Sequence, residues 1–231
     1  MSIKWMAVAA LLVSSAAFAA EPARHIAIYV EPFYKSAQVP GGTPQVAVGK
    51  QYSELLASNK PADILAVRDL IVAKPQVVTP MVMMVLAIRL YDVGLRDDAA
   101  FWFYVAKDRY IVMSDVLNVK TPQLAQAEDA MRNFSTLAGP FINGYAFCDL
   151  AKQKEAHAKA VAWVEANPYE VMFMAQAPAL PGDRAENHKR AIREAKERAA
   201  KERAYFDDAK NVENYYATRK RNEADVKYCW K

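Results

Sequence analysis

Carboxylates are the side chains of this sequence that could most readily carry out catalysis. The pair Asp97-Asp98, or single acids such as Glu31 and Asp149, could serve the acid–base chemistry of a cell-envelope hydrolase. Asp97-Asp98 also begins a predicted helix, where carboxylates cap free backbone N–H groups and complement the helix dipole, and we favour this role. The sequence has no GxSxG, SxxK or GxxxxGKS/T motif for a nucleophile or a phosphate. We therefore predict no catalytic residues and no enzyme, with the hydrolase as the alternative.

Methionine and histidine are the residues that could bind a metal. Five methionines fall in two clusters: Met81, Met83, Met84, Met172 and Met174. Thioether sulfur is a soft ligand suited to Cu(I), so a copper carrier is a second alternative function. The surroundings of both clusters are apolar, however, which favours gap filling in a helical core. The three histidines, His25, His157 and His188, are scattered and form no HExxH or Cys/His ligand spacing, so we predict no metal site and no cofactor.

The N-terminus has the pattern of a bacterial secretory signal peptide. Met1–Lys4 carries one positive charge, Met6–Val13 is an unbroken apolar run, and Ser14–Ala20 consists mostly of small residues. Ala17-Phe18-Ala19 presents small residues to signal peptidase, and the apolar run is too short to span the hydrocarbon core of a bilayer, about 30 Å thick. We therefore predict a signal peptide over residues 1–19, cleavage after Ala19, and a periplasmic protein.

Charge and hydropathy exclude two classes of interaction. Residues 1–19 contain one of the 30 basic residues, Lys4, and none of the 26 acidic ones, which leaves the mature chain with a net charge of +3. Nucleic-acid binding requires a concentrated basic face, which this balance does not supply. The most apolar later stretch, Val77–Leu90, is interrupted by Thr79 and Pro80, so we predict a core helix there and no transmembrane segment after signal cleavage.

The predicted export makes a disulfide between the two cysteines, Cys148 and Cys229, a reasonable expectation, because thiols are oxidised in the periplasm. A disulfide between them would close a loop of about 80 residues and stabilise the fold by about 4 kcal/mol. The alternative is a reactive Cys148 with His157 as its partner. A separation of nine residues at about 100° per residue places these two side chains on opposite faces of one helix. We therefore predict a disulfide between Cys148 and Cys229.

The mature chain is predicted to form one mostly α-helical domain of stacked antiparallel helices, with appendages at both ends. Residues 20–49 are rich in proline and include the alternating segment His25–Val30, which predicts an extended arm or a short strand. Residues 50–174 form the predicted helical core. Proline and glycine breakers there predict helices over residues 61–73, 80–93, 97–113, 122–137 and 140–166, the last as one helix or as two joined by a bend.

Beyond a predicted linker, residues 175–183, the composition changes to alanine and charge. Asp183 is a good N-cap, and pairs of glutamate with a basic residue four positions later support a long solvated helix. Its thin apolar stripe consists of Ile192, Ala195, Ala199, Phe206 and Ala209. We predict that this long charged helix and the tail after it, residues 184–231, pack on the core. A basic arm that docks on an acidic partner or an anionic membrane surface is the alternative.

Residues 83–106 carry the sequence features of a two-helix repeat. Leu86-Ala87 and Leu90 would lie on one helix, Gly94 in the turn, and Ala99, Phe103 and Ala106 on the next helix. This spacing resembles a tetratricopeptide or Sel1-like hairpin, in which small residues allow close approach and an aromatic ring fills the gap between the helices. The resemblance implies a stacked-helix scaffold whose concave face holds a peptide or protein segment. An ordinary antiparallel helix pair accounts for the same residues.

Four successive aromatic residues, Phe101–Tyr104, point in four directions about 100° apart on a helix. Either this helix is covered on several sides, or one ring, Trp102 or Tyr104, lies in a surface groove that a partner can reach. In the second case Trp102, Tyr104 and Arg109 are the predicted binding residues. We therefore predict an exported protein-binding module that acts on another envelope protein, as an adaptor, an assembly factor or an immunity-type inhibitor working by occlusion.

Overall fold

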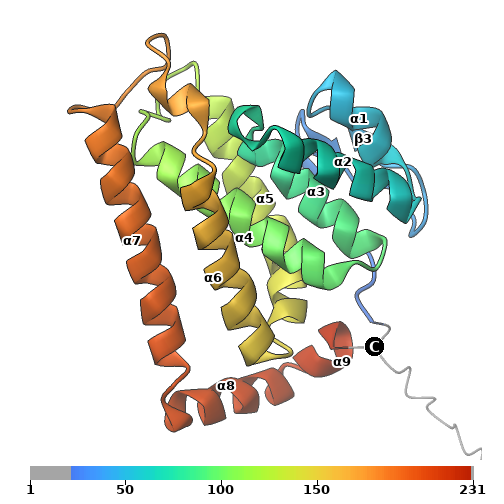
Figure 1. The fold of residues 1–231 in the computed structure, drawn as a ribbon. Coiled ribbons are helices and arrows are strands. Elements are labelled where there is room, and N and C mark those ends of the chain that lie inside the picture. Colours follow the sequence, from blue (N-terminus) through green and yellow to red (C-terminus); the bar gives the residue numbers. More distant parts are fainter. Residues whose placement is uncertain (1–21, 230–231) are drawn as a thin grey trace, which may run out of the picture.

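A computed structural model describes residues 22–229, and the predicted signal peptide over residues 1–19 lies outside this range. The described chain is mostly α-helical, as predicted, with nine α-helices and a small sheet near its N-terminus (Figure 1). Within residues 22–229, no helix is long and apolar enough to cross a membrane.

The N-terminal segment forms a three-stranded antiparallel sheet in the order β1-β2-β3: Tyr29–Val30, Tyr34–Lys35 and Gln45–Val46. Ile26, Ile28 and Val30 are buried, while Ala27 and Tyr29 between them are exposed. This period of two is the pattern of a half-buried extended chain. The predicted alternation over residues 25–30 is therefore confirmed, although only its last two residues are paired as strand.

The helices have these bounds: α1 Lys50–Ala57, α2 Pro61–Ala73, α3 Pro80–Asp92, α4 Arg96–Ser114, α5 Ala125–Ala146, α6 Leu150–Ala166, α7 Arg184–Tyr205, α8 Ala209–Arg221 and α9 Ala224–Tyr228. Short 3₁₀ turns, η1 Pro75–Val77 and η2 Glu170–Phe173, follow α2 and α6. The predictions for α2, α3 and α4 are correct to within one residue. Prolines 61 and 80 occupy first helical turns, and Gly94, with a φ of 90°, makes the turn between α3 and α4.

The predicted helix boundary at Gly139-Pro140 is wrong, because α5 continues through Pro140 to Ala146. A proline inside a helix removes one backbone hydrogen bond. Here Phe134, Ala138 and Ile142 are buried on both sides of it, so one continuous packing face offsets that loss. The chain instead breaks after residue 146, and the Asp149 carboxylate starts α6 by accepting hydrogen bonds from the N–H groups of Ala151 and Lys152.

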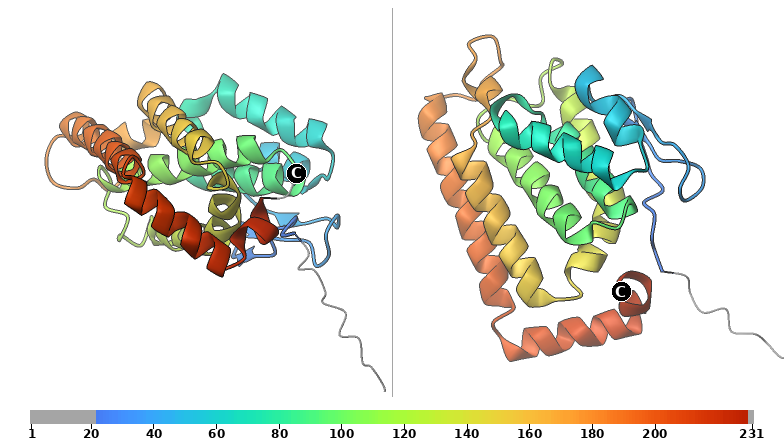
Figure 2. Two further views of the ribbon diagram at one scale, coloured as in Figure 1. Left: turned by 90° about the horizontal axis from the view of Figure 1, so that it is seen from below. Right: turned by 45° about the vertical axis from the view of Figure 1, so that its right-hand side comes forward.

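The C-terminal helix is also shorter than predicted. Its apolar stripe predicted one helix as far as Ala209, but α7 ends at Tyr205 and Asp208 caps a separate helix, α8. The Asp208 carboxylate accepts hydrogen bonds from the N–H groups of Lys210 and Asn211, which competes with continuation of α7. Figures 1 and 2 show α8 crossing the ends of α6 and α7 and leading back toward the N-terminal segment. There the Ala23 N–H donates to the Lys227 carbonyl over 2.8 Å.

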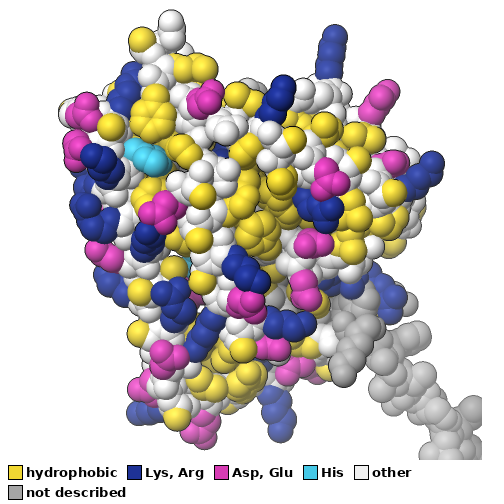
Figure 3. All heavy atoms as spheres, viewed as in Figure 1, with side chains coloured by type: hydrophobic (Ala, Val, Ile, Leu, Met, Phe, Trp, Pro, Cys, Tyr) yellow, Lys and Arg dark blue, Asp and Glu magenta, His cyan; other side chains and the backbone are white. Residues whose placement is uncertain are grey.

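Helix α4 is the centre of the fold and contacts α3, α5, α6 and α7. Successive helices from α3 to α7 alternate in direction, so α4 and α6 run the same way and their first turns lie at the same end (Figure 1). The residue numbers of the contacting pairs increase along both helices, from Asp97 with Lys152 to Asp108 with His157, as expected of parallel helices. In the space-filling view, hydrophobic side chains gather across the middle of the face, with charged side chains of both signs around them (Figure 3).

Candidate functional site

The candidate site is a pocket of about 620 Å³ at the shared N-terminal end of α4 and α6. The C-terminal end of α5 and the two half-cystines, Cys148 and Cys229, complete its wall. Because α4 and α6 run the same way, both helices contribute their first turns. The pocket is therefore built from three chain segments that are remote in sequence: residues 97–101, residues 145–159 and Cys229.

The pocket has a charged rim and an apolar floor. The rim consists of Asp97, Asp98, Asp149, Lys152, Glu155 and Lys159, most of them exposed. The floor consists of Ala100, Phe101, Ala146 and Ala156. A water-excluding apolar centre inside a polar, solvated rim is the usual anatomy of a protein interface.

The rim carboxylates differ in how they are bonded. The Tyr145 hydroxyl donates to Asp97 Oδ1 over 2.8 Å, and Lys152 Nζ lies 3.4 Å from the other oxygen of the same carboxylate. Burial and the Asp97 carboxylate raise the pKa of Tyr145 to about 12, so its hydroxyl stays protonated and can donate. Glu155 is paired with Lys159 at 2.6 Å. The carboxylate of Asp98, which is half-buried, has no hydrogen bond or ion pair within residues 22–229.

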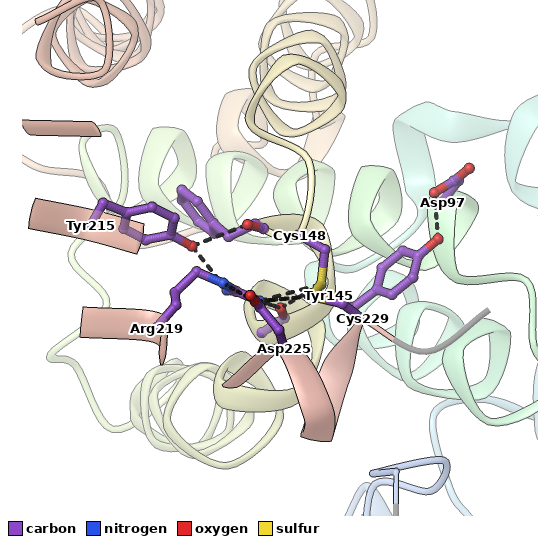
Figure 4. Close-up of a disulfide and its surroundings, with 9 residues drawn as sticks. Asp97, Tyr145, Cys148, Tyr215, Arg219, Asp225 and Cys229 are labelled. Carbon is purple, nitrogen blue, oxygen red and sulfur yellow. Dashed lines mark hydrogen bonds and ion pairs between the residues drawn. A yellow bond between two sulfur atoms is a disulfide. The ribbon is translucent and has the colours of Figure 1, made fainter. Parts of the chain in front are cut away.

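The predicted disulfide between Cys148 and Cys229 is confirmed and forms part of the pocket wall. Figure 4 shows the Tyr145–Asp97 pair on one side of it and Arg219 with Tyr215 and Asp225 on the other. The buried Arg219 guanidinium donates to Asp225 Oδ1 over 2.7 Å and to the Gly144 carbonyl over 3.1 Å. Its Nη2 also lies 3.3 Å and 2.9 Å from the two sulfur atoms. The disulfide and Arg219 together fasten α8 and α9 to the end of α5.

Gly144 allows the close approach that this arrangement requires. A Cβ atom at this position would lie 2.6 Å from the ring of Tyr228 on α9. Any side chain at residue 144 would therefore push α9 away from α5 and shift the pocket wall that Cys229 provides.

A buried polar network lies beneath the pocket and joins α4, α6 and α7. The imidazole of His157 lies 3.3 Å from Asp108 Oδ2 through Nε2 and 3.4 Å from Glu202 Oε1 through Nδ1. Gln153 Nε2 donates to Glu202 Oε1 over 2.6 Å and to the Tyr104 hydroxyl over 3.2 Å. Gln153 also lines the pocket, and its Oε1 is buried without a hydrogen-bond partner among the described residues.

We expect this network to make the stability of the fold depend on pH. Burial lowers the pKa of His157, but the close contacts and charges of the Asp108 and Glu202 carboxylates outweigh burial and raise it to about 9. A pKa above the unfolded value of about 6.5 means that the folded state binds the proton more tightly. The stabilisation is therefore complete below pH 6.5 and is lost as the pH rises through 9. At about 1.4 kcal/mol per pKa unit, the loss is at most about 3 kcal/mol.

Urea unfolding at pH 6 and pH 9.5 measures this loss, and His157→Gln should remove most of it. His188→Gln is the matched control, because burial lowers the pKa of that imidazole and its proton affects stability only below pH 6.5. His25, whose pKa is raised by its hydrogen bond to Asp92, contributes in the same direction as His157 and remains in both variants. If His157→Gln lost as much stability between pH 6 and pH 9.5 as the native chain, the network would not be the source of the pH dependence.

The predicted binding residues do not lie in a surface groove. Trp102, Tyr104 and Arg109 are buried, because α3, α5, α6 and α7 pack around α4. Trp102 packs edge-to-face on Trp163, and the Tyr104 ring stacks on His157. The prediction that Trp102 or Tyr104 is exposed to a partner is therefore wrong, and the alternative of a central helix covered on several sides is correct. Phe101 is the ring of this run that is half-buried and lines the pocket.

The methionine clusters lie mostly in the hydrophobic core. Met83, Met84 and Met172 are buried there, as gap filling predicted, whereas Met174 is exposed. Within residues 22–229, no group of three or more histidine, cysteine or acidic side chains is arranged to hold a metal ion.

Comparison with known proteins gives one informative match. The chain is 34% identical over 214 residues to a protein of Haemophilus influenzae, and the match covers 91% of this chain and 81% of that protein. The chain belongs to the family of this protein. No protein-family model and no solved structure matches the chain. The relative is named an uncharacterized protein, so its name assigns no activity and the function is argued from the pocket.

Sequence reasoning missed most of the pocket. Asp97-Asp98 was the only pair of rim residues with a local signal, and that signal predicted helix capping. The prediction is wrong for the capping hydrogen bonds, because the N-cap of α4 is Leu95 and no side chain caps it, but both carboxylates lie in the first turn, where they complement the dipole. Tyr145, Lys152 and Gln153 lie in or beside helix ends with no motif around them, and only the parallel placement of α4 and α6 brings them together. The cysteine pair was the one pocket feature with a non-local signal in the sequence.

Proposed function

We propose that this protein is a protein-binding module of the bacterial envelope that receives a segment of a partner protein in the pocket between α4 and α6. The observation that carries the proposal is the layout of that pocket, an apolar floor around Phe101 inside a rim of charged, mostly exposed side chains. The resemblance of residues 83–106 to a tetratricopeptide or Sel1-like hairpin supports the same class of function. An assembly factor and an immunity-type inhibitor would both use the pocket in this way.

The setting we propose is the periplasm. The signal peptide pattern over residues 1–19 supports export, and the Cys148–Cys229 disulfide is the bond expected of an oxidising compartment. The pocket depends on that bond, because both half-cystines line it. A chain that reached this compartment and was oxidised there would therefore present a complete pocket.

A carboxylate-dependent hydrolase is the competing proposal, because four acidic side chains share the pocket. Hydrolysis of a glycosidic bond requires two carboxyl groups available on either side of the bond. Asp97 is bonded to Tyr145 and Lys152, and Glu155 is paired with Lys159. Asp149 caps α6, which leaves Asp98 as the one rim carboxylate with no partner in the described chain. These bonds favour binding over chemistry, and solubilisation of purified cell-wall sacculi by the protein would reverse that preference.

Site-specific photocrosslinking in the native cells tests the proposal. A photoreactive phenylalanine analogue at Lys159, on the pocket rim, is expected to give one stoichiometric protein adduct. The same analogue at Lys189 on α7, which has a similar exposure, should give none. Mass spectrometry of the adduct then identifies the partner.

A pocket-filling variant makes the test specific to the pocket. Ala156→Phe places a ring on the pocket floor and is expected to reduce the adduct at least about fivefold, the loss for about 1 kcal/mol of binding. Ala158→Phe adds the same ring to another half-buried alanine of α6 that does not line the pocket, and should retain the adduct. Circular dichroism confirms that both variants fold. Equal adduct in the two variants, or none from position 159 of the native chain, would refute the proposal.

A further inference from the structure

The charged rim of the pocket is unbalanced toward negative charge. It holds four carboxylates and two ammonium groups, and both ammonium groups are already paired, Lys152 with Asp97 and Lys159 with Glu155. Asp149 is used as the N-cap of α6. Asp98 thus remains as a half-buried carboxylate with no partner among residues 22–229.

The helix dipoles do not cancel this excess. Each helix N-terminus is equivalent to about half a positive charge. Asp97 in the first turn of α4 and Asp149 at the start of α6 each place a full negative charge beside one of these ends. Asp98 adds a second carboxylate to the α4 end, so the pocket stays negative after both dipoles are counted.

A second, independent feature also calls for a hydrogen-bond donor. Gln153 is 1% exposed and lines the pocket, and its Oε1 has no hydrogen-bond partner in the part of the chain that the structure describes. Its amide nitrogen is fixed by bonds to Tyr104 and Glu202, which determines the orientation of the amide. A buried acceptor left without a donor costs about 1 to 3 kcal/mol, so a ligand donor that reaches Oε1 from the pocket would gain affinity.

We propose that the pocket binds a lysine or arginine side chain of the partner segment, with an adjoining apolar side chain of that segment packed on Phe101. This proposal rests on the proposed function and names the chemistry of the partner. A cation supplies the charge that Asp98 lacks and several N–H donors, and the apolar neighbour covers the alanines of the floor. The cationic group is directed to Asp98.

Blocked peptides of sequence Gly-Ser-Leu-X-Ser-Gly test the chemistry on the full oxidised protein, with X as Lys, Arg, Gln or Glu. Two-dimensional NMR follows the amide signals of the first turns of α4 and α6 during titration. The apparent Kd values obtained from these shifts are expected to be at least about threefold lower for the Lys and Arg peptides than for the Gln peptide. The Glu peptide should bind more weakly still.

Two matched pairs of variants assign the effect to single charges. Asp98→Asn should weaken binding of the Lys peptide about threefold to tenfold, whereas Glu128→Gln, an acid in the first turn of α5 outside the pocket, should not. Lys152→Gln should tighten binding a few-fold, because it frees Asp97 from its ammonium partner. Lys189→Gln breaks an ion pair of almost equal exposure on α7 and should leave binding unchanged.

The outcomes separate this proposal from the proposed function. Unchanged binding of the Lys peptide to Asp98→Asn, or equal binding of the Glu peptide, overturns the basic-segment proposal even if photocrosslinking finds a partner in the pocket. Selective binding of the Lys and Arg peptides with loss of affinity in Asp98→Asn is the expected result. That result combined with no protein adduct from position 159 would overturn the protein-binding function and leave the preference for cations intact.

Discussion

Replacing both cysteines with serine is expected to lower the free energy of unfolding by about 4 to 5 kcal/mol. Cys148 and Cys229 are 81 residues apart, and the loop that their bond closes restricts the unfolded chain over more than a third of its length. Loss of loop-closure entropy on this scale is the main source of the stabilisation. Urea unfolding of the double variant and of the oxidised native chain measures the difference.

The reduced native chain provides the control for this prediction. In dithiothreitol its unfolding curve should shift to that of Cys148→Ser/Cys229→Ser, while the reductant should leave the double variant unchanged. A double variant within about 1 kcal/mol of the oxidised native chain would show that α8 and α9 are held by packing and by Arg219 instead. The same comparison under photocrosslinking reports whether the pocket survives without its disulfide wall.

The disulfide also fastens the N-terminal arm, which gives its loss a second consequence. Ala23 donates its N–H to the Lys227 carbonyl over 2.8 Å, and the Tyr91 hydroxyl donates to the Ala23 carbonyl over 2.5 Å. The arm thus lies between α3 and α9, and α9 is held by Cys229. We expect backbone amides of residues 23–28 to exchange faster with solvent once the bond is removed.

Local signals in the sequence predicted the helices whose ends are chemically marked. Pro61, Pro80 and Gly94 each act within one turn of the chain, and the structure places a helix end at each of them. The boundary predicted at Pro140 was wrong because the helix there is decided by packing between segments remote in sequence and not by a local signal. The cost of the proline is offset by burial of residues on either side of it, and burial depends on α3 and α4, which pack against α5 from elsewhere in the sequence.

The candidate site depends on geometry that no local pattern contains. Asp98 and Gln153 are separated by more than fifty residues, and they line one pocket only because α4 and α6 run in the same direction. The same geometry explains the error over Trp102 and Tyr104. Their spacing correctly indicated that the rings point in different directions, but the helices packed around α4 cover Trp102, Phe103 and Tyr104 and leave Phe101 half-buried in the pocket.

Arg109 was predicted to bind a partner, but in the structure it stabilises the fold. Its replacement is expected to have the second large effect on the free energy of unfolding. Arg109 is 1% exposed, and its guanidinium donates to the carbonyls of Pro75 and Val78 over 2.6 and 3.0 Å and to the Asn167 carbonyl over 2.7 Å. The group also lies 5.0 Å from the centre of the Trp163 ring. One side chain thus joins the α2–α3 connection to the end of α6.

Burial lowers the pKa of Arg109 to about 10, which leaves the side chain charged at neutral pH. The three carbonyl oxygens and the aromatic faces supply the negative partial charge that compensates it. Arg109→Met keeps the apolar stem but leaves those carbonyls without donors in the interior. We expect the free energy of unfolding to fall by about 3 to 5 kcal/mol, because hydrogen bonds to a charged group contribute about 1.5 to 3 kcal/mol each and are not additive.

Arg109→Lys distinguishes the geometry of the guanidinium from its charge. A lysine ammonium keeps the charge but cannot span carbonyls on both sides, so this variant should also lose at least about 2 kcal/mol. Arg132→Met is the control, because that arginine is 65% exposed and its ion pair with Asp129 lies within α5, so its loss should cost less than about 1 kcal/mol. Urea unfolding of the three variants ranks them. If Arg109→Lys were as stable as the native chain, charge alone would hold the α2–α3 connection against α6, and the fork of the guanidinium would have no structural role.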